Sequence, residues 1–339
     1  MGKRQHVAAD QINQRQQQAA QGKQPFQYSQ QVRGNSSGRL ARALNPAFGG
    51  KRHSKDVNGK SVTSYTFALD FTGSNINDAQ IVWAKLPELF GLIATQSWGG
   101  EHPNVQVAGI GDAVSDHFPA QLSQFESDGI TMDKWMDMMI LEGNGGGQGT
   151  ESYEMMFWLL SNQNDLDVWK RGQKGVLFVI FDELPHSRLP VSHLRELYAQ
   201  TDVDPNDNQV LSEGMAQTST IPLPSQDIPL DEIIRDLRSK YDVYAITCSQ
   251  SSYYGHNTQQ WQQWFGNENV IQLQDSRDIV GMIAAIIGSR AAVDIGTIST
   301  EIDRLKLGDG AAISNALAKV NTQATLQNIQ TGTSRAKRL

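Results

Sequence analysis

Short apolar runs, each ending in a turn or an acidic residue, alternate with segments of helical period in the middle of the chain. The clearest runs are residues 65–70, 105–110 and 175–181, and the first and last lead into Asp70 and Asp182. Runs this short and apolar are typical of strands that are buried on both faces of a sheet. A strand, a helix and a second strand in succession predict a parallel pair.

The same alternation continues to about residue 290. Further strands are expected at 243–247 and 270–273, and residues 118–126 are expected to form an antiparallel edge strand. Helices are expected at 78–96, 132–141, 230–240 and 277–287. The fold class predicted is therefore α/β, with a doubly wound, mostly parallel sheet and helices on both faces.

The two ends of the chain differ from this middle part. Residues 1–60 are rich in Gln and carry a net charge of +9, whereas the whole chain carries −7, so the remainder carries −16. Without an apolar period, this segment is predicted to be a disordered basic tail. The predicted organisation is a tail at 1–60, a domain at 61–290 with a polar insertion at 185–229, and a helical, basic appendage at 291–339.

Cysteine content and hydropathy bear on the cellular compartment. Cys248 is the single cysteine and lies in an apolar run, so it is expected to pack in the core rather than to react. No apolar segment has the length of a membrane span, and the N-terminus does not resemble a signal peptide. We expect a cytoplasmic protein with no membrane partner.

Polar residues gather where the predicted strands end, which is where open α/β sheets bind ligands. Asp70, Thr72 and Ser74 follow the first strand, Thr150 follows a glycine-rich stretch, and Asp182 follows the strand at 175–181. Carboxylate and hydroxyl oxygens suit a hard cation, so Mg²⁺ or Mn²⁺ is expected, with Ca²⁺ as a further candidate. Singly, each residue can be explained as a cap or a strand end, but their joint placement favours a metal site.

These residues make the chain resemble the von Willebrand factor type A (vWA) domain and its metal-ion-dependent adhesion site. The family pattern, Asp-x-Ser-x-Ser with a later Thr and Asp, is matched over residues 62–289, with Thr72 in place of the first Ser. Glu183 stands where the family often has Gly. Asp112 and Asp116 are candidates for the outer shell of the site, although an exposed loop would explain them equally well.

The resemblance implies a non-enzymatic, metal-dependent protein-interaction module, in which an Asp or Glu of a protein partner completes the coordination of the cation. Intracellular members of this kind commonly act in multiprotein assemblies, often with a separate MoxR-type ATPase. One alternative is a metal-dependent phosphoryl-transfer or hydrolytic enzyme using Asp70, but Thr72 occupies the position of its expected second acid. Another is a nucleic-acid-associated scaffold that acts through the basic tail.

Three weaker signals are better explained without a ligand. Residues 202–213 have acid spacing that imitates a calcium loop, but Asp207 occupies the position of the required Gly. The glycine-rich stretch at 143–149 lacks the Lys of a phosphate-binding loop. The histidines, among them His102, His117 and His186, are expected to be surface groups.

Overall fold

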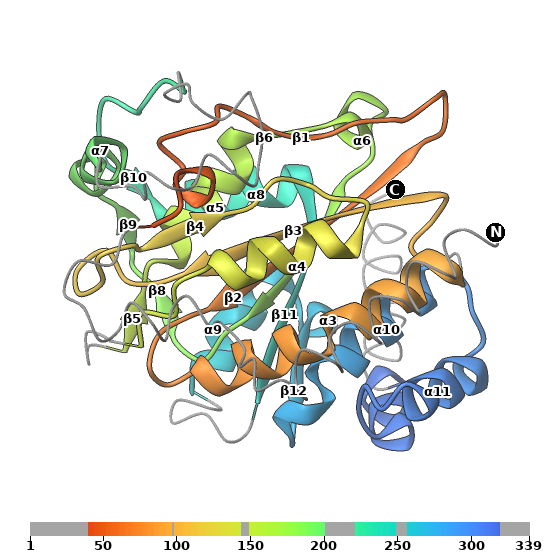
Figure 1. The fold of residues 1–339 in the computed structure, drawn as a ribbon. Coiled ribbons are helices and arrows are strands. Elements are labelled where there is room, and N and C mark those ends of the chain that lie inside the picture. Colours follow the sequence, from red (N-terminus) through yellow and green to blue (C-terminus); the bar gives the residue numbers. More distant parts are fainter. Residues whose placement is uncertain (1–39, 97, 144–148, 201–220, 249–255, 319–339) are drawn as a thin grey trace, which may run out of the picture.

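The computed structural model describes residues 40–96, 98–143, 149–200, 221–248 and 256–318 (Figure 1). Its main sheet has six strands in the order β12–β11–β7–β2–β3–β4. Numbered by their appearance along the chain, the strands of this sheet follow the order 3-2-1-4-5-6, which is a common doubly wound order. The strands are β2 (Val62–Asp70), β3 (His102–Ile110), β4 (Ala120–Leu122), β7 (Gly175–Ile180), β11 (Tyr241–Cys248) and β12 (Val270–Leu273).

The pairing confirms the predicted fold class. β2 pairs in parallel with both β3 and β7, and β11 pairs in parallel with both β7 and β12. β4 pairs antiparallel with β3 at the edge of the sheet, as expected for residues 118–126. β2 and β7 are therefore the two central strands, and each is buried along nearly its whole length.

Helices cover both faces of the sheet (Figure 1). On one face, α3 (Ile76–Thr95), α4 (Gly129–Met138) and α10 (Ile279–Arg290) pack against Phe67 and Leu69 of β2. On the other, α5 (Tyr153–Gln163), α8 (Leu230–Lys240) and α9 (His256–Phe265) share a cluster with Ala68. Alternate β2 side chains thus serve two cores, because successive strand residues point to opposite faces. Cys248 is buried at the end of β11, as expected.

Residues 40–60 belong to the described structure, which corrects their assignment to a disordered tail. The 3₁₀ helix η1 (Arg42–Leu44) buries Leu44 completely, and β1 (Arg52–Ser54) pairs in parallel with β6 (Asn164–Leu166). The buried Arg52 guanidinium donates to the carbonyl oxygens of Phe48 and Ala43, both at 3.1 Å. These contacts involve carbonyl groups and distant strands, so they leave no periodic pattern in the sequence. Residues 1–39 lie outside the described residues.

The C-terminal segment also departs from the predicted organisation. α11 (Ile295–Arg304) and the helix at 310–318 pack onto α10, so the described part of the appendage shares the domain's core. A Cβ atom on Gly281 of α10 would lie 2.4 Å from Ile313 Cδ1, which shows how closely these helices approach. The helical character predicted for this appendage is therefore present at residues 295–304 and 310–318. No helix in the described chain has the length and apolarity required to cross a membrane.

The described parts of the predicted insertion at 185–229 contribute to the fold as well. β9 (Arg188–Leu189) pairs antiparallel with β10 (Ile228–Pro229), and α7 (Val191–Ala199) lies between them in sequence. Leu194 and Leu197 of α7 are buried in the same cluster as α5 and α8. The acidic stretch at residues 202–213 that imitates a calcium loop lies outside the described residues.

Replacing Leu44 with Ala should destabilise the domain, because the buried side chain would leave a cavity in a packed cluster. Substitutions of this type cost about 2–5 kcal/mol. Urea unfolding of Leu44→Ala, compared with the exposed Lys51→Ala as a matched control, measures the effect. Equal stability of the two variants would mean that residues 40–60 contribute nothing to the fold.

Candidate functional site

The site lies at the carboxyl ends of β2 and β7, the central neighbours in the sheet. β2 ends at Asp70, and Asp182 follows β7 after a single intervening residue. Because the strands are parallel and adjacent, both carboxyl groups lie at the same edge of the sheet. Each is only 1% exposed. The structure thus brings together the two acids that the sequence placed on different loops.

Hydrogen bonds fix both oxygens of the Asp70 carboxyl group. Oδ1 accepts from the Thr72 backbone N at 2.8 Å and from Thr72 Oγ1 at 2.6 Å, forming a tight turn after the strand. Oδ2 accepts from the hydroxyl of Tyr153, the first residue of α5. The Tyr153 hydroxyl in turn accepts from the backbone N of Asp182 at 3.4 Å. Tyr153, which is fully buried, therefore links the two acidic loops.

Burial and charge make this arrangement electrostatically unfavourable for two carboxylates. Burial, followed by the negative charge of Asp182, raises the pKa of Asp70 to about 7. The hydrogen bonds from Thr72 and Tyr153 oppose this rise because they stabilise the charged form. Burial and the adjacent carboxylates also hold the pKa of Tyr153 well above its ordinary value, so its hydroxyl stays a proton donor.

Packing beneath the loop explains why it holds its position. The Phe71 ring is 1% exposed and lies directly over Gly109 of β3, where an added Cβ would be 2.3 Å from Phe71 Cε2. The Phe71 backbone N donates to the Ile110 carbonyl oxygen at 2.7 Å, and Gly143 N donates to the Phe71 carbonyl oxygen at 3.1 Å. The absence of a side chain at Gly109 thus allows the Asp70 loop to sit on the sheet.

The remaining two predicted ligands occupy different surroundings. Ser74 is exposed in the turn before α3. Thr150 is half-buried and begins β5 (Thr150–Glu151), pairing with Leu184 of β8 (Leu184–Pro185). Since Leu184 is two residues beyond Asp182, Thr150 lies at the same edge of the sheet as the two acids. Thr150 does not cap α5 as its position suggested, because the residue before that helix is Ser152.

Asp112 and Asp116, the predicted outer acids, form a hydrogen-bonded turn after β3. The Asp112 side chain is 1% exposed and its Oδ1 lies 3.1 Å from His186 Nε2. Burial favours a higher pKa for Asp112, but the hydrogen bonds from His186, Val114 N and Ser115 outweigh it and lower the pKa. Burial raises the pKa of Asp116 to about 6. A fully exposed loop is therefore ruled out for Asp112.

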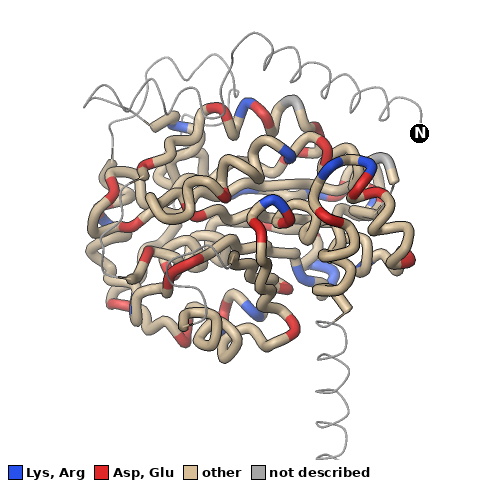
Figure 2. Tube along the Cα trace, turned by 90° about the horizontal axis from the view of Figure 1, so that it is seen from below, with Lys and Arg blue, Asp and Glu red and all other residues tan. Residues whose placement is uncertain are grey.

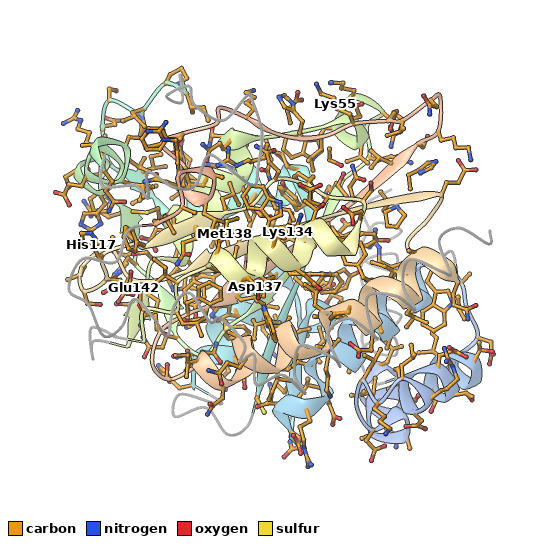
Figure 3. All side chains as sticks on the ribbon, viewed as in Figure 1. Lys55, His117, Lys134, Asp137, Met138 and Glu142 are labelled. Carbon is orange, nitrogen blue, oxygen red and sulfur yellow. The ribbon has the colours of Figure 1, made fainter. Side chains whose placement is uncertain are left out.

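His186 was expected to be a surface group, but the structure shows it partly buried. Its side chain is 20% exposed, and the hydrogen bond to Asp112 raises its pKa. Its backbone N donates to Glu154 Oε2 at 3.0 Å. The Phe118 backbone N donates to Glu142 Oε1 at 2.9 Å, and Figure 3 shows His117 and Glu142 toward the same side of the molecule.

Three further acids at this edge were missed by the sequence analysis as members of the site. Glu151, Glu154 and Glu183 are 1%, 0% and 6% exposed. Burial raises the pKa of Glu151 to about 10, that of Glu154 to about 8 and that of Glu183 to about 7. One signal was available: the two Glu residues of Thr-Glu-Ser-Tyr-Glu stand directly before the apolar run at residues 155–160, and charged residues are unusual beside such a run.

The described residues contain no group of three or more His, Cys, Asp and Glu side chains arranged to hold a metal ion. The predicted ligand set differs from such a group, because it combines two carboxylates with hydroxyl groups of Ser and Thr. Two of its members, Asp70 and Thr72, are hydrogen-bonded to each other, and Asp182 is linked to them through Tyr153.

Comparison with known proteins gives likeness at the level of the fold. No family model matches the sequence, and no curated protein matches it significantly. The pilus adhesin SpaC from Lactobacillus rhamnosus GG, in its open conformation, is similar with a TM-score of 0.44 and 13% identity, over 74% of this chain and 31% of the adhesin.

Two other solved structures show a similar degree of likeness. The vWF domain of the type V pilus tip protein Mfa5 from Porphyromonas gingivalis has a TM-score of 0.42 and 11% identity, over 69% of this chain and 96% of that domain. Proximal thread matrix protein 1 from the mussel byssus has a TM-score of 0.40 and 9% identity, over 67% of this chain and 48% of its own. Function must therefore be argued from the site itself.

The raised pKa of Asp70 predicts how stability depends on pH in chelator-treated protein. The folded-state pKa of about 7 exceeds the ordinary 3.8, so the folded form keeps a proton that the unfolded form releases in this window. The free energy of unfolding should therefore fall as pH rises from about 4 to about 7. Asp70→Asn should show a shallower fall in urea titrations, whereas the exposed Glu232→Gln should not. Identical pH profiles for Asp70→Asn and wild type would refute a raised pKa of Asp70 in the folded protein.

Proposed function

We propose that this chain is a protein-interaction module whose binding depends on a divalent cation at the carboxyl edge of the sheet. The observation that carries the proposal is the burial of Asp70 and Asp182 side by side at the ends of adjacent strands, where their charges repel. A cation between them would offset that repulsion. The proposed ligands are Asp70, Thr72, Ser74, Thr150 and Asp182.

The chemistry of the donor set fits Mg²⁺ or Mn²⁺, and also admits Ca²⁺. These hard cations prefer carboxylate, hydroxyl and water oxygens. The Thr72 hydroxyl is buried beside the Asp70 carboxylate, and Thr150 lies beside the Asp182 loop. When bound, the cation would act as a Lewis acid toward an external oxygen ligand. With several ligands neutral, it would keep enough positive charge to attract the carboxylate of a partner.

The surface of the loop is compatible with the approach of a partner. Gly73 and Ser74 are exposed, whereas Asp70 and Thr72, which precede them in the same loop, are buried. A partner Asp or Glu could therefore reach a cation from the side of Ser74. We extend the proposal to a multiprotein assembly with a separate MoxR-type ATPase, as the vWA resemblance implies.

The burial and hydrogen bonding of Asp70 favour a binding function over phosphoryl transfer. A nucleophilic carboxylate needs an oxygen that can reach the substrate. Here Oδ1 accepts two hydrogen bonds from Thr72, Oδ2 accepts one from Tyr153, and the carboxyl group is 1% exposed. These contacts suit a fixed ligand more than an attacking group.

Mg²⁺ or Mn²⁺ should stabilise the wild-type protein, because a ligand that binds only the folded state adds about 2.7 kcal/mol at a concentration 100 times its Kd. Thermal melts should show this rise in wild type and in Glu232→Gln, but not in Asp70→Asn or Asp182→Asn. In chelator, both site variants should be at least as stable as wild type, since one repelling charge is gone. Equal metal-induced shifts in all four proteins would exclude the proposed ligands.

Partner capture should depend on the same residues. Immobilised wild type, incubated with an extract of its source cells in Mg²⁺, should retain a protein that chelator releases. Asp70→Ala and Asp182→Ala should fail to retain it while keeping their circular dichroism spectra, and Glu232→Gln should retain it. Metal-dependent turnover of phosphoesters by wild type, abolished in Asp70→Ala, would instead establish the enzymatic alternative.

A further inference from the structure

A second candidate binding site lies between two helices, away from the strand ends that carry Asp70 and Asp182. A pocket of about 440 Å³ between α8 and α9 is lined by Lys174, which directly precedes β7, and by Arg238 near the C-terminal end of α8. Trp264, near the end of α9, also lines it. α8 leads directly into the start of β11, so Arg238 and Lys174 place the cationic end of the pocket at the amino ends of the strands. Asp70 and Asp182 lie at their carboxyl ends.

The pocket concentrates positive charge on a chain whose net charge is −7. Lys174, Arg235 and Arg238 all line it and are exposed. The ion pairs among the described residues include none of these three side chains. Figure 2 shows Lys and Arg residues interspersed with Asp and Glu residues along the described chain. Three cations around one pocket therefore form a local site for an anion.

Trp264 gives the pocket a fixed aromatic wall. Its half-buried indole packs at 70° against Trp261, with 6.1 Å between ring centroids, and Trp261 is fully buried. Ile234, which is 4% exposed, supplies an apolar contact in the same pocket. An indole that is anchored on one side and lines a pocket can stack against a planar ring at a small cost in side-chain entropy.

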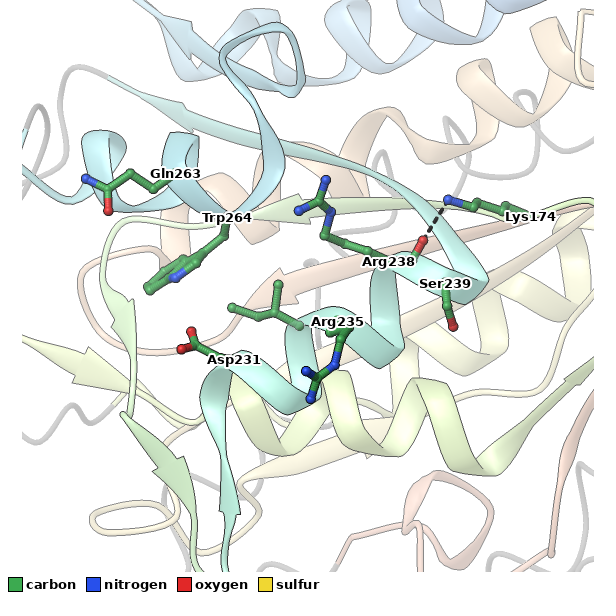
Figure 4. A pocket seen from close by; sticks show the side chains of 8 residues that line it. Lys174, Asp231, Arg235, Arg238, Ser239, Gln263 and Trp264 are labelled. Atoms are coloured by element: carbon green, nitrogen blue, oxygen red, sulfur yellow. Dashed lines mark hydrogen bonds between the residues drawn. The ribbon is translucent and has the colours of Figure 1, made fainter. Parts of the chain in front are cut away.

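The pocket is also polarised. Figure 4 shows Trp264 and Asp231 toward one end and Lys174 with Ser239 toward the other. Lys174 Nζ donates to the Arg238 carbonyl oxygen at 2.7 Å, which holds the ammonium group at the pocket. An aromatic and acidic end therefore faces a cationic end. A ligand that fits has a planar ring with N–H donors at one end and an anionic group at the other.

We propose that this pocket binds a nucleotide unit, either a free nucleotide or one unit of a single-stranded nucleic acid. The base would stack on Trp264 and offer an amino group to Asp231, while the phosphate would contact Arg238 and Lys174. An acidic peptide fits less well, because Asp231 would repel a carboxylate at the aromatic end. The cationic end of this pocket and the proposed metal site lie at opposite ends of the strands. One molecule can therefore engage two partners at once.

Fluorescence anisotropy of a labelled oligodeoxyadenylate of about ten nucleotides, whose bases carry the required amino group, tests this proposal with the full chain. Arg238→Glu and Trp264→Leu should each weaken binding about tenfold, and Arg238→Glu should also lower the salt dependence. Arg195→Glu, an exposed position on α7, makes the same change in charge away from the pocket and should bind like wild type. The basic N-terminal residues are present in every protein compared, so they do not produce these differences.

The two sources of the ligand are separated by competition with ADP. Displacement by ADP identifies a free nucleotide, and resistance to ADP with retained effects of both variants identifies a single strand; either result supports the proposal. Equal binding by Arg238→Glu and Arg195→Glu would overturn it. Displacement by polyglutamate as efficient as that by an unlabelled oligonucleotide of equal charge would also overturn it, because the pocket would then recognise charge alone.

Discussion

The carboxyl edge of the sheet depends on one electrostatic constraint, the close burial of Asp70 and Asp182. Each acid lies at the end of a central strand, away from water that would screen its charge. The Tyr153 hydroxyl donates to Asp70 and accepts from the Asp182 backbone, so a neutral group joins two loops that would otherwise repel. A protonated Asp70 or a bound cation relieves the same repulsion, and this shared role connects stability with the proposed function.

The fold imposes this constraint through its strand order. The crossover from β3 and β4 to β7 places β7 beside β2, although more than a hundred residues separate the strands in sequence. Hydrophobic side chains on both faces of β2 fix its register, because a shift of one residue would exchange the two cores. The burial of apolar residues thus holds the two acids together against their mutual repulsion.

The same topology separates two surfaces of opposite charge. Strand ends at the carboxyl edge carry a dense group of buried acids, including Glu151 and Glu154, whereas the amino edge carries the exposed cations Arg235 and Arg238. Lys174 donates to the Arg238 carbonyl oxygen, whereas Asp70 accepts from Thr72 and Tyr153, so the side chains at the two ends of the strands have different hydrogen-bond partners. The proposed metal-dependent contact and the proposed nucleotide contact can therefore be altered independently by substitution.

The sequence by itself determined the alternation of strands and helices, and the placement of Asp70, Thr72 and Asp182 at strand ends, because these are local patterns of hydropathy and chain order. Only the tertiary structure decided which groups surround them. Tyr153 became part of the site because α5 begins beside both loops, and Arg52 joined the core because its strand pairs with residues more than a hundred positions away. Such contacts are set by long-range packing, which local periodicity does not record.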